Sequence, residues 1–203
     1  MNRYLIYIKS SCETCVAIKN VLVELSYRDD VEIINQEAEP IPGLERQSFD
    51  ESLERSFRAE IESVPTVIQL KAGVERVRHQ GWVKAEWSAL FDFTFDESLP
   101  TFKPGCASKT LDPGRIEKLQ AQFQPERLQS RRLTFTNADD IEVAYDQGWS
   151  DGLPVVPPTP ERVHRMLGGT TRAPSEVVGK VPPDYGLCTI EKIAVNEIGR
   201  AHV

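Results

Sequence analysis

The sequence predicts an α/β fold: a central mixed sheet flanked by helices over residues 1–95, then a linker and a partial second domain that is mainly helical or irregular. Two observations lead to this prediction. Short β-rich runs alternate with stretches of helical periodicity in the first half of the chain. That periodicity fades into Pro, Gly, Ser and Asp over residues 96–114, a composition typical of a linker.

The first β-rich run leads directly into a helix. Residues 4–8, Tyr-Leu-Ile-Tyr-Ile, have the length and composition of a buried strand. Ser10 and Ser11 follow and can cap a helix N-terminus. Apolar residues then recur at helical spacing along one face, at Cys15, Ile18, Leu22 and Leu25. Cys12 and Cys15 are therefore expected where strand gives way to helix.

The rest of the first domain continues this alternation. Residues 31–35 predict a second strand. A helix is expected at the next apolar stripe, which comprises Phe49, Leu53, Phe57 and Ile61. Residues 67–70 and 75–79 predict an antiparallel hairpin. A last helix is expected to cover the sheet with an apolar face of Trp87, Leu90 and Phe91.

The second domain, expected over residues 115–196, has a different pattern. Residues 116–123 and 140–147 predict helices. A third helix is expected after Thr159, because threonine is a good N-cap and Pro160 suits the first helical position. The pattern therefore predicts short helices joined by irregular segments.

The C-terminal residues are interpreted separately. Residues 198–203, Ile-Gly-Arg-Ala-His-Val, match the in-frame translation of a common sequencing adapter. We therefore expect residues 197–203 to be a non-native tail and assign no function to His202. On this interpretation the natural reading frame is cut near Asn196, within a helix that starts at Thr189.

Composition and charge exclude several classes of function. The formal net charge of -7 and the pI near 5.1 argue against binding to nucleic acid, which needs clustered Lys and Arg. No apolar run approaches the roughly 20 residues that span a bilayer, so no membrane partner is expected. No stretch has the length of a signal-peptide core, and the four dispersed cysteines are too few for a secreted disulfide framework. A cytoplasmic location is therefore expected.

Cys12 and Cys15 form a Cys-x-x-Cys pair, whose sulfurs can face each other across one helical turn. The N–H groups and partial positive charge of a helix N-terminus favour the thiolate of the first cysteine. Cys12 is therefore expected to attack a disulfide, and Cys15 to resolve the mixed disulfide that forms. Two alternatives stay open: the pair could be inert buried thiols, or it could bind zinc, although further ligands at suitable spacing are scarce.

The order of motifs across the first domain resembles the thioredoxin and glutaredoxin superfamily: strand, Cys-x-x-Cys, helix, strand, helix, then Val-Pro-Thr entering a hairpin. The resemblance implies that Pro65 follows a cis peptide bond and lies against the Cys-x-x-Cys turn. It also implies that the neighbouring backbone binds an extended substrate strand. The expected substrate-binding residues are Val64, Pro65, Thr66, Gly81 and Trp82. Alternatively, Trp82 anchors the last helix in the core.

Three residues depart from this family's motif and are expected to tune it: Ser11, Glu13 and Thr14. Serines replace the usual aromatic-containing approach, and Glu-Thr replaces the Gly-Pro of thioredoxins or the Pro-Tyr of glutaredoxins. The anionic Glu13 is expected to oppose thiolate formation, raise the pKa of Cys12 relative to strongly oxidising relatives and favour a reducing role. The buried carboxylate that assists the resolving cysteine in thioredoxins has no equivalent, since the strand position near Ile6 is apolar.

Residues 145–162 resemble the start of an uncharacterised bacterial domain labelled UGSC-like, a name that implies no chemistry. The cysteine signature of that domain is absent, and residues 105–108, Gly-Cys-Ala-Ser, are the nearest string. Isolated cysteines such as Cys106 and Cys188 are more often inert. Either one could nevertheless accept electrons from the Cys-x-x-Cys pair.

Together these features predict a thiol–disulfide oxidoreductase that reduces or exchanges disulfides through Cys12 and Cys15. No bound cofactor and no metal are expected. The expected partners are a disulfide-containing protein or small-thiol substrate, and a reductant that is itself a protein or a small thiol. Two alternatives remain: a redox-sensing or protein-docking module on the same fold, or the N-terminal part of a larger enzyme.

Overall fold

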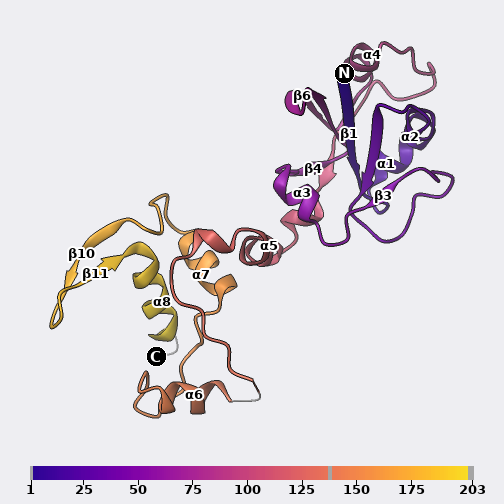
Figure 1. The fold of residues 1–203 in the computed structure, drawn as a ribbon. Helices are drawn as coiled ribbons and strands as arrows, with labels where there is room; N and C mark the ends of the chain where they lie inside the picture. The colour runs from indigo at the N-terminus through magenta and orange to yellow at the C-terminus, as the bar shows by residue number, and fades with distance from the viewer. Residues whose placement is uncertain (1, 137–138, 201–203) are drawn as a thin grey trace. The chain divides into compact units, whose positions relative to one another are not determined.

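The computed structural model of the protein describes residues 2–136 and 139–200 (Figure 1). The chain divides into two compact units, and the boundary lies directly after Ile116. The end of the expected adapter-derived tail, residues 201–203 with His202, lies outside the described residues. The first unit extends beyond the first domain that the sequence predicts.

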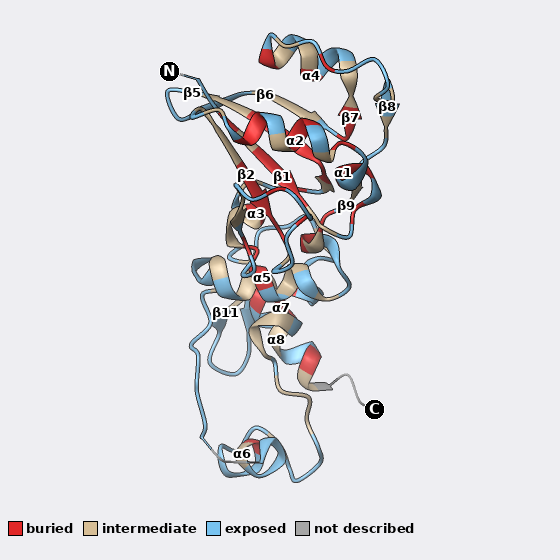
Figure 2. Ribbon diagram, turned by 90° about the vertical axis from the view of Figure 1, so that its right-hand side faces the viewer, coloured by how far each residue is buried: buried red, intermediate tan, exposed pale blue. Residues whose placement is uncertain are grey.

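The first unit is α/β, as predicted, and in the described residues its centre is a mixed five-stranded sheet of order β3-β2-β1-β5-β6. The strands are β1 (Asn2–Ile8), β2 (Val31–Asn35), β3 (Ser48–Phe49), β5 (Thr66–Lys71) and β6 (Val74–Gln80). β1 runs parallel to β2 and antiparallel to β5, which pairs antiparallel with β6. Figure 2 shows that buried residues concentrate on the central strands. Ile6 of β1 is fully buried there.

Helices lie on both faces of this sheet (Figure 1). The helices of the first unit are α1 (Glu13–Ala17), α2 (Lys19–Ser26), α3 (Glu54–Arg58) and α4 (Lys84–Phe91). α2 and α4 pack on the face that carries Tyr4, whose ring centroid lies 4.8 Å from that of Phe91. Arg28, just after α2, donates to the Phe91 carbonyl at 3.1 Å. α3 lies on the opposite face.

The helix predicted over residues 49–61 is shorter than expected. Phe49 instead ends β3, where it pairs with β2. Asp50 is buried, and its carboxylate accepts hydrogen bonds from the backbone N–H and the hydroxyl of Ser56, each at 2.7 Å. These bonds satisfy N–H groups in the first turn of α3, and the N-cap residue Leu53 has a left-handed φ of 60°, which a helix does not adopt. α3 therefore begins only at Glu54, and the prediction was wrong for the start of the stripe.

Residues 96–114, which the sequence predicts as a linker, pack against the first unit. β8 (Phe102–Lys103) pairs antiparallel with β7 (Trp82–Val83). β9 (Cys106–Ala107) pairs antiparallel with β4 (Ser63–Val64). The stretch from the start of β8 to the end of β9 is called the docked segment below.

Side chains of the first unit hold both ends of the docked segment. Before it, the indole N–H of Trp82 donates to the Pro100 carbonyl at 2.6 Å. After it, the buried Gln36 donates to the Ser108 hydroxyl at 2.8 Å. The 3-10 helix η1 (Lys109–Leu111) follows. This part of the chain is low in periodicity because short strands and turns, rather than helices, attach it to the sheet.

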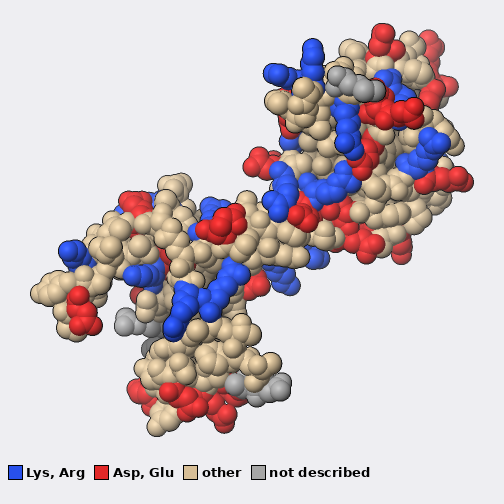
Figure 3. Space-filling model, viewed as in Figure 1, with Lys and Arg blue, Asp and Glu red and all other residues tan. Residues whose placement is uncertain are grey.

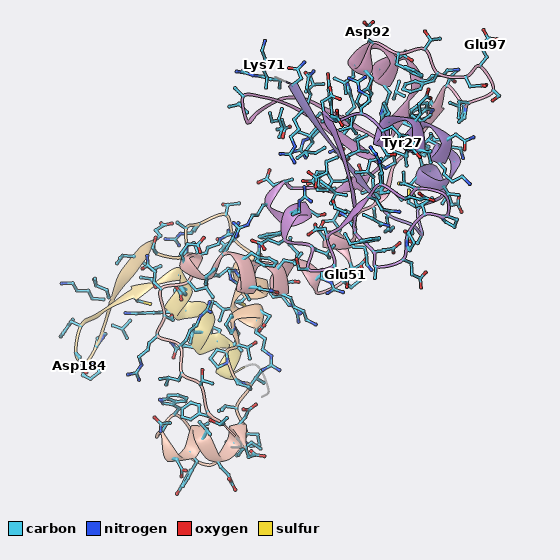
Figure 4. All side chains as sticks on the ribbon, turned by 45° about the vertical axis from the view of Figure 1, so that its right-hand side comes forward. Tyr27, Glu51, Lys71, Asp92, Glu97 and Asp184 are labelled. Carbon is cyan, nitrogen blue, oxygen red and sulfur yellow. The ribbon has the colours of Figure 1, made fainter. Side chains whose placement is uncertain are left out.

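The second unit is built mainly from short helices, as predicted. Its elements are α5 (Arg115–Phe123), which starts in the first unit, the 3-10 helix η2 (Pro125–Arg127), α6 (Asp140–Asp146), α7 (Pro160–Leu167), β10 (Val177–Val181), β11 (Gly186–Thr189) and α8 (Ile190–Arg200). Thr159 is the N-cap of α7, as expected. The β10–β11 hairpin, whose turn carries Asp184 (Figure 4), was not predicted.

The core of the second unit is small. Its buried apolar residues are Val163, Leu167, Ala194 and Ile198, from α7 and α8. α8 continues to Arg200, so the first residues of the expected adapter-derived tail are helical, and Ile198 lies in this core. Apolar residues of β10 and β11 stay exposed.

Charge is distributed differently on the two units. Basic and acidic side chains are interspersed on the face of the first unit seen in Figure 3. In the second unit, acidic side chains gather over α6, at Asp139, Asp140, Glu142 and Asp146 (Figure 3). Within residues 2–136 and 139–200, no helix combines the length and the apolarity that a membrane crossing requires.

Candidate active site

Cys12 and Cys15 lie where β1 gives way to a helix, as the sequence predicts. The backbone N–H of Cys12 donates to the Lys9 carbonyl at 3.1 Å, and Cys12 is the N-cap of α1. Its Sγ accepts a hydrogen bond from the backbone N–H of Cys15 at 3.4 Å. The Cys15 side chain also lies close enough to Cys12 to shift its pKa. Both residues are buried, with Cys12 only 1% exposed.

A third cysteine, Cys106, belongs to the same site. β9 places it opposite Val64 of β4, and its thiol is close enough to Cys12 to shift the pKa of that cysteine. Cys106 is half-buried. Cys188 lies in β11 of the second unit. The sequence left these two isolated cysteines equivalent, whereas the fold gathers Cys106 with the Cys-x-x-Cys pair.

The pKa of Cys12 is lowered from its ordinary value of 9.0 to about 5. The hydrogen bond from the Cys15 side chain is the largest cause, and burial acts against it by disfavouring the charge. The thiol of Cys106 and the backbone N–H groups of Cys15 and Thr14 stabilise the thiolate further. At neutral pH Cys12 is therefore a thiolate, the nucleophilic form of cysteine.

Glu13 follows Cys12 in the sequence but is not among the main causes of the pKa shift of Cys12. Its side chain is exposed at the start of α1, where water and salt screen its charge. The pKa of Cys12 falls because the hydrogen bonds from Cys15 and Cys106 reach its sulfur directly. These hydrogen bonds are thus the main cause of the lowered pKa of Cys12, and the expectation that Glu13 raises it relative to strongly oxidising relatives stays a prediction.

The other two cysteines of the site are held as thiols. Burial raises the pKa of Cys15 well above its ordinary value, and its hydrogen bond to Cys12 raises it further. The same two causes raise the pKa of Cys106. A protonated thiol can donate to a thiolate. The site therefore holds one thiolate between two thiols.

Pro65 and its neighbours line the site beside Cys12. The Val64–Pro65 peptide bond is cis, as expected. When protonated, Cys12 can donate to the Val64 carbonyl, which lies 3.4 Å from its Sγ. Thr66 is fully buried, and its hydroxyl donates to the Ser63 carbonyl at 2.7 Å. The Val64 backbone, expected to bind a substrate strand, is paired here with β9 of the chain itself.

Gly81 and Trp82 follow the hairpin and adjoin the same region. The backbone N–H of Gly81 donates to the Pro65 carbonyl at 2.7 Å. Trp82 is fully buried, and its ring centroid lies 5.2 Å from that of Trp87. Its indole N–H is bonded to the Pro100 carbonyl. Of the two roles that the sequence left open for Trp82, this position fits that of a core anchor.

Two of the expected tuning residues contact groups that sequence reasoning missed. Ser11 donates its backbone N–H and its hydroxyl to the carboxylate of Glu37, at 2.8 and 2.9 Å. Thr14 is buried and donates its hydroxyl to the Pro104 carbonyl at 2.7 Å. Glu37 could have been predicted to lie near Ser11, because it follows β2, which runs parallel to β1. Nothing in the sequence indicated the contact with Pro104, because residues 96–114 have the composition of a linker.

No protein-family model matches the chain, and no curated protein sequence matches it. In the part of the chain that the structure describes, no group of three or more His, Cys, Asp and Glu side chains is arranged to hold a metal ion. The chemistry that the geometry offers is that of sulfur: a buried thiolate with two thiols hydrogen-bonded to it.

Proposed function

We propose that the chain is a thiol–disulfide oxidoreductase on a thioredoxin-like fold, with Cys12 as the nucleophile and Cys15 as the resolving cysteine. The observation that carries the proposal is the position of Cys12 at the N-cap of α1, where its Sγ accepts the backbone N–H of the buried Cys15 at 3.4 Å. The lowered pKa of Cys12 agrees with this position. The strand order β2-β1-β5-β6 and the cis bond before Pro65, next to Cys12, support the fold assignment. A reducing compartment such as the cytoplasm would keep this pair ready to react.

The exchange has two steps. The Cys12 thiolate attacks one sulfur of a substrate disulfide, and the other sulfur leaves as a thiolate that takes up a proton. Cys15 then loses its proton and attacks the Sγ of Cys12 in the mixed disulfide. The substrate is released as a dithiol, and the two cysteines become a disulfide. A protein or small thiol reduces that disulfide and closes the cycle.

A redox titration of the full chain tests this proposal. The chain is equilibrated with defined mixtures of reduced and oxidised glutathione, acid-quenched, alkylated and mapped by mass spectrometry. We expect a reversible two-electron transition that links Cys12 to Cys15 and is lost in Cys12→Ser. Cys188→Ser is the matched control and should titrate like the wild type. If the two thiols stay unlinked across the whole range, the proposal fails.

A redox-sensing module is the second candidate, and one observation favours it. Cys12 is 1% exposed beneath the docked segment, so a protein substrate reaches it only if that segment moves. Thiol-driven reduction of insulin, a protein disulfide, separates the two functions. An oxidoreductase turns over many insulin molecules per chain and loses this on Cys12→Ser. A sensor forms its disulfide in the titration but reduces no insulin.

A further inference from the structure

The docked segment covers the reactive side of Cys12 with the protein's own backbone. β9 pairs with β4, and this register places Cys106 directly opposite Val64. The Val64 carbonyl is also the group that lies 3.4 Å from the Cys12 sulfur. On the other side of the motif, Thr14 binds the Pro104 carbonyl at 2.7 Å. Backbone pairing and a side-chain hydrogen bond thus hold Cys106 against Cys12.

The fit between the docked segment and the sheet leaves no space for a side chain at Gly81. A Cβ there would lie 2.9 Å from the backbone nitrogen of Gly105 and 3.1 Å from the Lys103 carbonyl oxygen. Gly81 also has a φ of +74°, which favours glycine. Because the two backbones approach this closely only at a glycine, the contact indicates that the docked segment has a specific position on the first unit.

We propose that Cys106 is a third redox cysteine, which exchanges a disulfide with Cys12, and that the docked segment is the built-in partner that presents it. The proposal rests on the proposed function, because it needs the disulfide between Cys12 and Cys15 as its starting point. It extends that function by giving the oxidised site two alternative disulfides. The docked segment then acts as an internal substrate of the site.

The exchange is an isomerisation and needs no further oxidant. The Cys106 thiolate attacks the Sγ of Cys12 in the disulfide, a bond forms between these two sulfurs, and the bond to Cys15 breaks. The electron pair leaves on the sulfur of Cys15. The proton that Cys106 gave up returns to Cys15, so one disulfide and one thiol remain.

The electrostatics of the site favour this exchange only after oxidation. In the reduced site, the negative charge of Cys12 helps to raise the pKa of both Cys15 and Cys106. A disulfide at Cys12 carries no charge, so this effect vanishes and Cys106 ionises more readily. Cys106 is also half-buried, whereas Cys15 is fully buried, so the exchange moves the oxidised partner towards the surface.

Disulfide trapping in full-length variants tests the proposal. Cys15→Ser with Cys188→Ser leaves Cys12 and Cys106, and this variant is treated with oxidised glutathione. We expect Cys12 to form a glutathione adduct that Cys106 then displaces, so that the Cys12–Cys106 disulfide accumulates and the adduct is lost. Acid quenching, alkylation and peptide mapping by mass spectrometry identify the product. Persistence of the glutathione adduct on Cys12 overturns the proposal.

Two matched variants make this outcome specific. Cys15→Ser with Cys106→Ser leaves Cys12 and Cys188, the same number of cysteines, and should retain the glutathione adduct. Cys106→Ser with Cys188→Ser retains the Cys-x-x-Cys pair. If this Cys106→Ser, Cys188→Ser variant forms the Cys12–Cys15 disulfide while Cys12 and Cys106 never link in the first variant, the role of Cys106 fails and the proposed function stands. If the Cys106→Ser, Cys188→Ser variant forms no disulfide, the proposed function fails.

The docking itself has a separate test with a matched glycine. Gly81→Ala introduces a Cβ into the contact with the docked segment, and we expect iodoacetamide to alkylate Cys12 several-fold faster. Gly73→Ala is the control, because Gly73 has a similar φ of +78° but no atom within 4 Å of the added Cβ. Equal alkylation rates in both variants would mean that the segment does not cover Cys12.

Discussion

The three cysteines of the site share one corner of the first unit, yet their pKa values move in opposite directions. Cys12 receives hydrogen bonds from both neighbouring thiols and from backbone N–H groups, so its thiolate is stabilised despite burial. Cys15 and Cys106 are the donors, and burial disfavours their charged forms. All three side chains are thiols, so the opposite pKa shifts arise from their roles in the hydrogen bonds. Cys12 accepts these bonds, whereas Cys15 and Cys106 donate them.

The first prediction concerns the titration of Cys12. Because its pKa is lowered to about 5, the thiolate forms as the pH rises through that value and is complete at pH 7. Cys15→Ala removes the largest stabilising hydrogen bond and should raise the pKa most, and Cys106→Ala should raise it less. Ultraviolet thiolate absorbance against pH measures this, after subtraction of the same variant carrying Cys12→Ser.

The control for this titration is Cys188→Ala, which lies in the second unit and should leave the midpoint unchanged. A wild-type midpoint near 9 would contradict the hydrogen-bond account of the site. So would an unchanged midpoint in Cys106→Ala, because the thiol of Cys106 would then contribute nothing to the thiolate. A matching test of Glu13→Gln should show little change, since the carboxylate is exposed.

At the scale of elements, one buried carboxylate decides where α3 begins. Asp50 is 3% exposed and accepts hydrogen bonds from Ser56 and from the backbone N–H of Arg55. Ser56 is fully buried, so its N–H and hydroxyl would lose their partner without this carboxylate. We predict that Asp50→Ala lowers the free energy of unfolding by about 2–4 kcal/mol.

Glu51 offers a matched control for this substitution. It is the next residue in the chain, it is also acidic, and its side chain is exposed (Figure 4). Glu51→Ala should change the free energy of unfolding by less than about 0.5 kcal/mol. Urea denaturation followed by the fluorescence of the buried Trp82 and Trp87 measures both variants. Equal losses would show that the Asp50 hydrogen bonds contribute no stability.

The sequence predicts those elements whose apolar pattern coincides with burial. Residues 4–8 and the face of Cys15, Ile18, Leu22 and Leu25 belong to the core, as expected. The pattern fails at Phe49, where an apolar residue at helical spacing is 43% exposed and ends a strand. Periodicity does not reveal a cap such as Asp50, because that cap depends on Ser56 folding back onto it.

The candidate active site was only partly predictable for a related reason. Cys12, Cys15 and Pro65 stand in recognisable local motifs, and the structure brings them together. Cys106 stands in no local motif. It reaches the site because β9 pairs with β4, where its partner Val64 lies 42 positions earlier in the sequence. Pro104 and Gly105 suggest a linker by composition, although here they allow a close approach of two backbones. Long-range pairing of two-residue strands leaves no periodic pattern to detect.

At the scale of the whole molecule, the boundary after Ile116 leads to the last prediction. Residues 1–116 should fold alone. Residues 1–95 lack three hydrogen-bond partners that the longer piece retains: Pro100 for Trp82, Ser108 for Gln36 and Thr110 for the Ile61 carbonyl. At about 0.5–1.5 kcal/mol for each of these three bonds, the shorter piece should be less stable by about 1.5–4.5 kcal/mol. Urea denaturation of both pieces measures the difference, and Cys12 should react faster with iodoacetamide in residues 1–95. If the two pieces have equal stability and Cys12 reacts equally fast in both, residues 96–114 are a linker after all. Their hydrogen bonds would then neither stabilise the first unit nor protect Cys12.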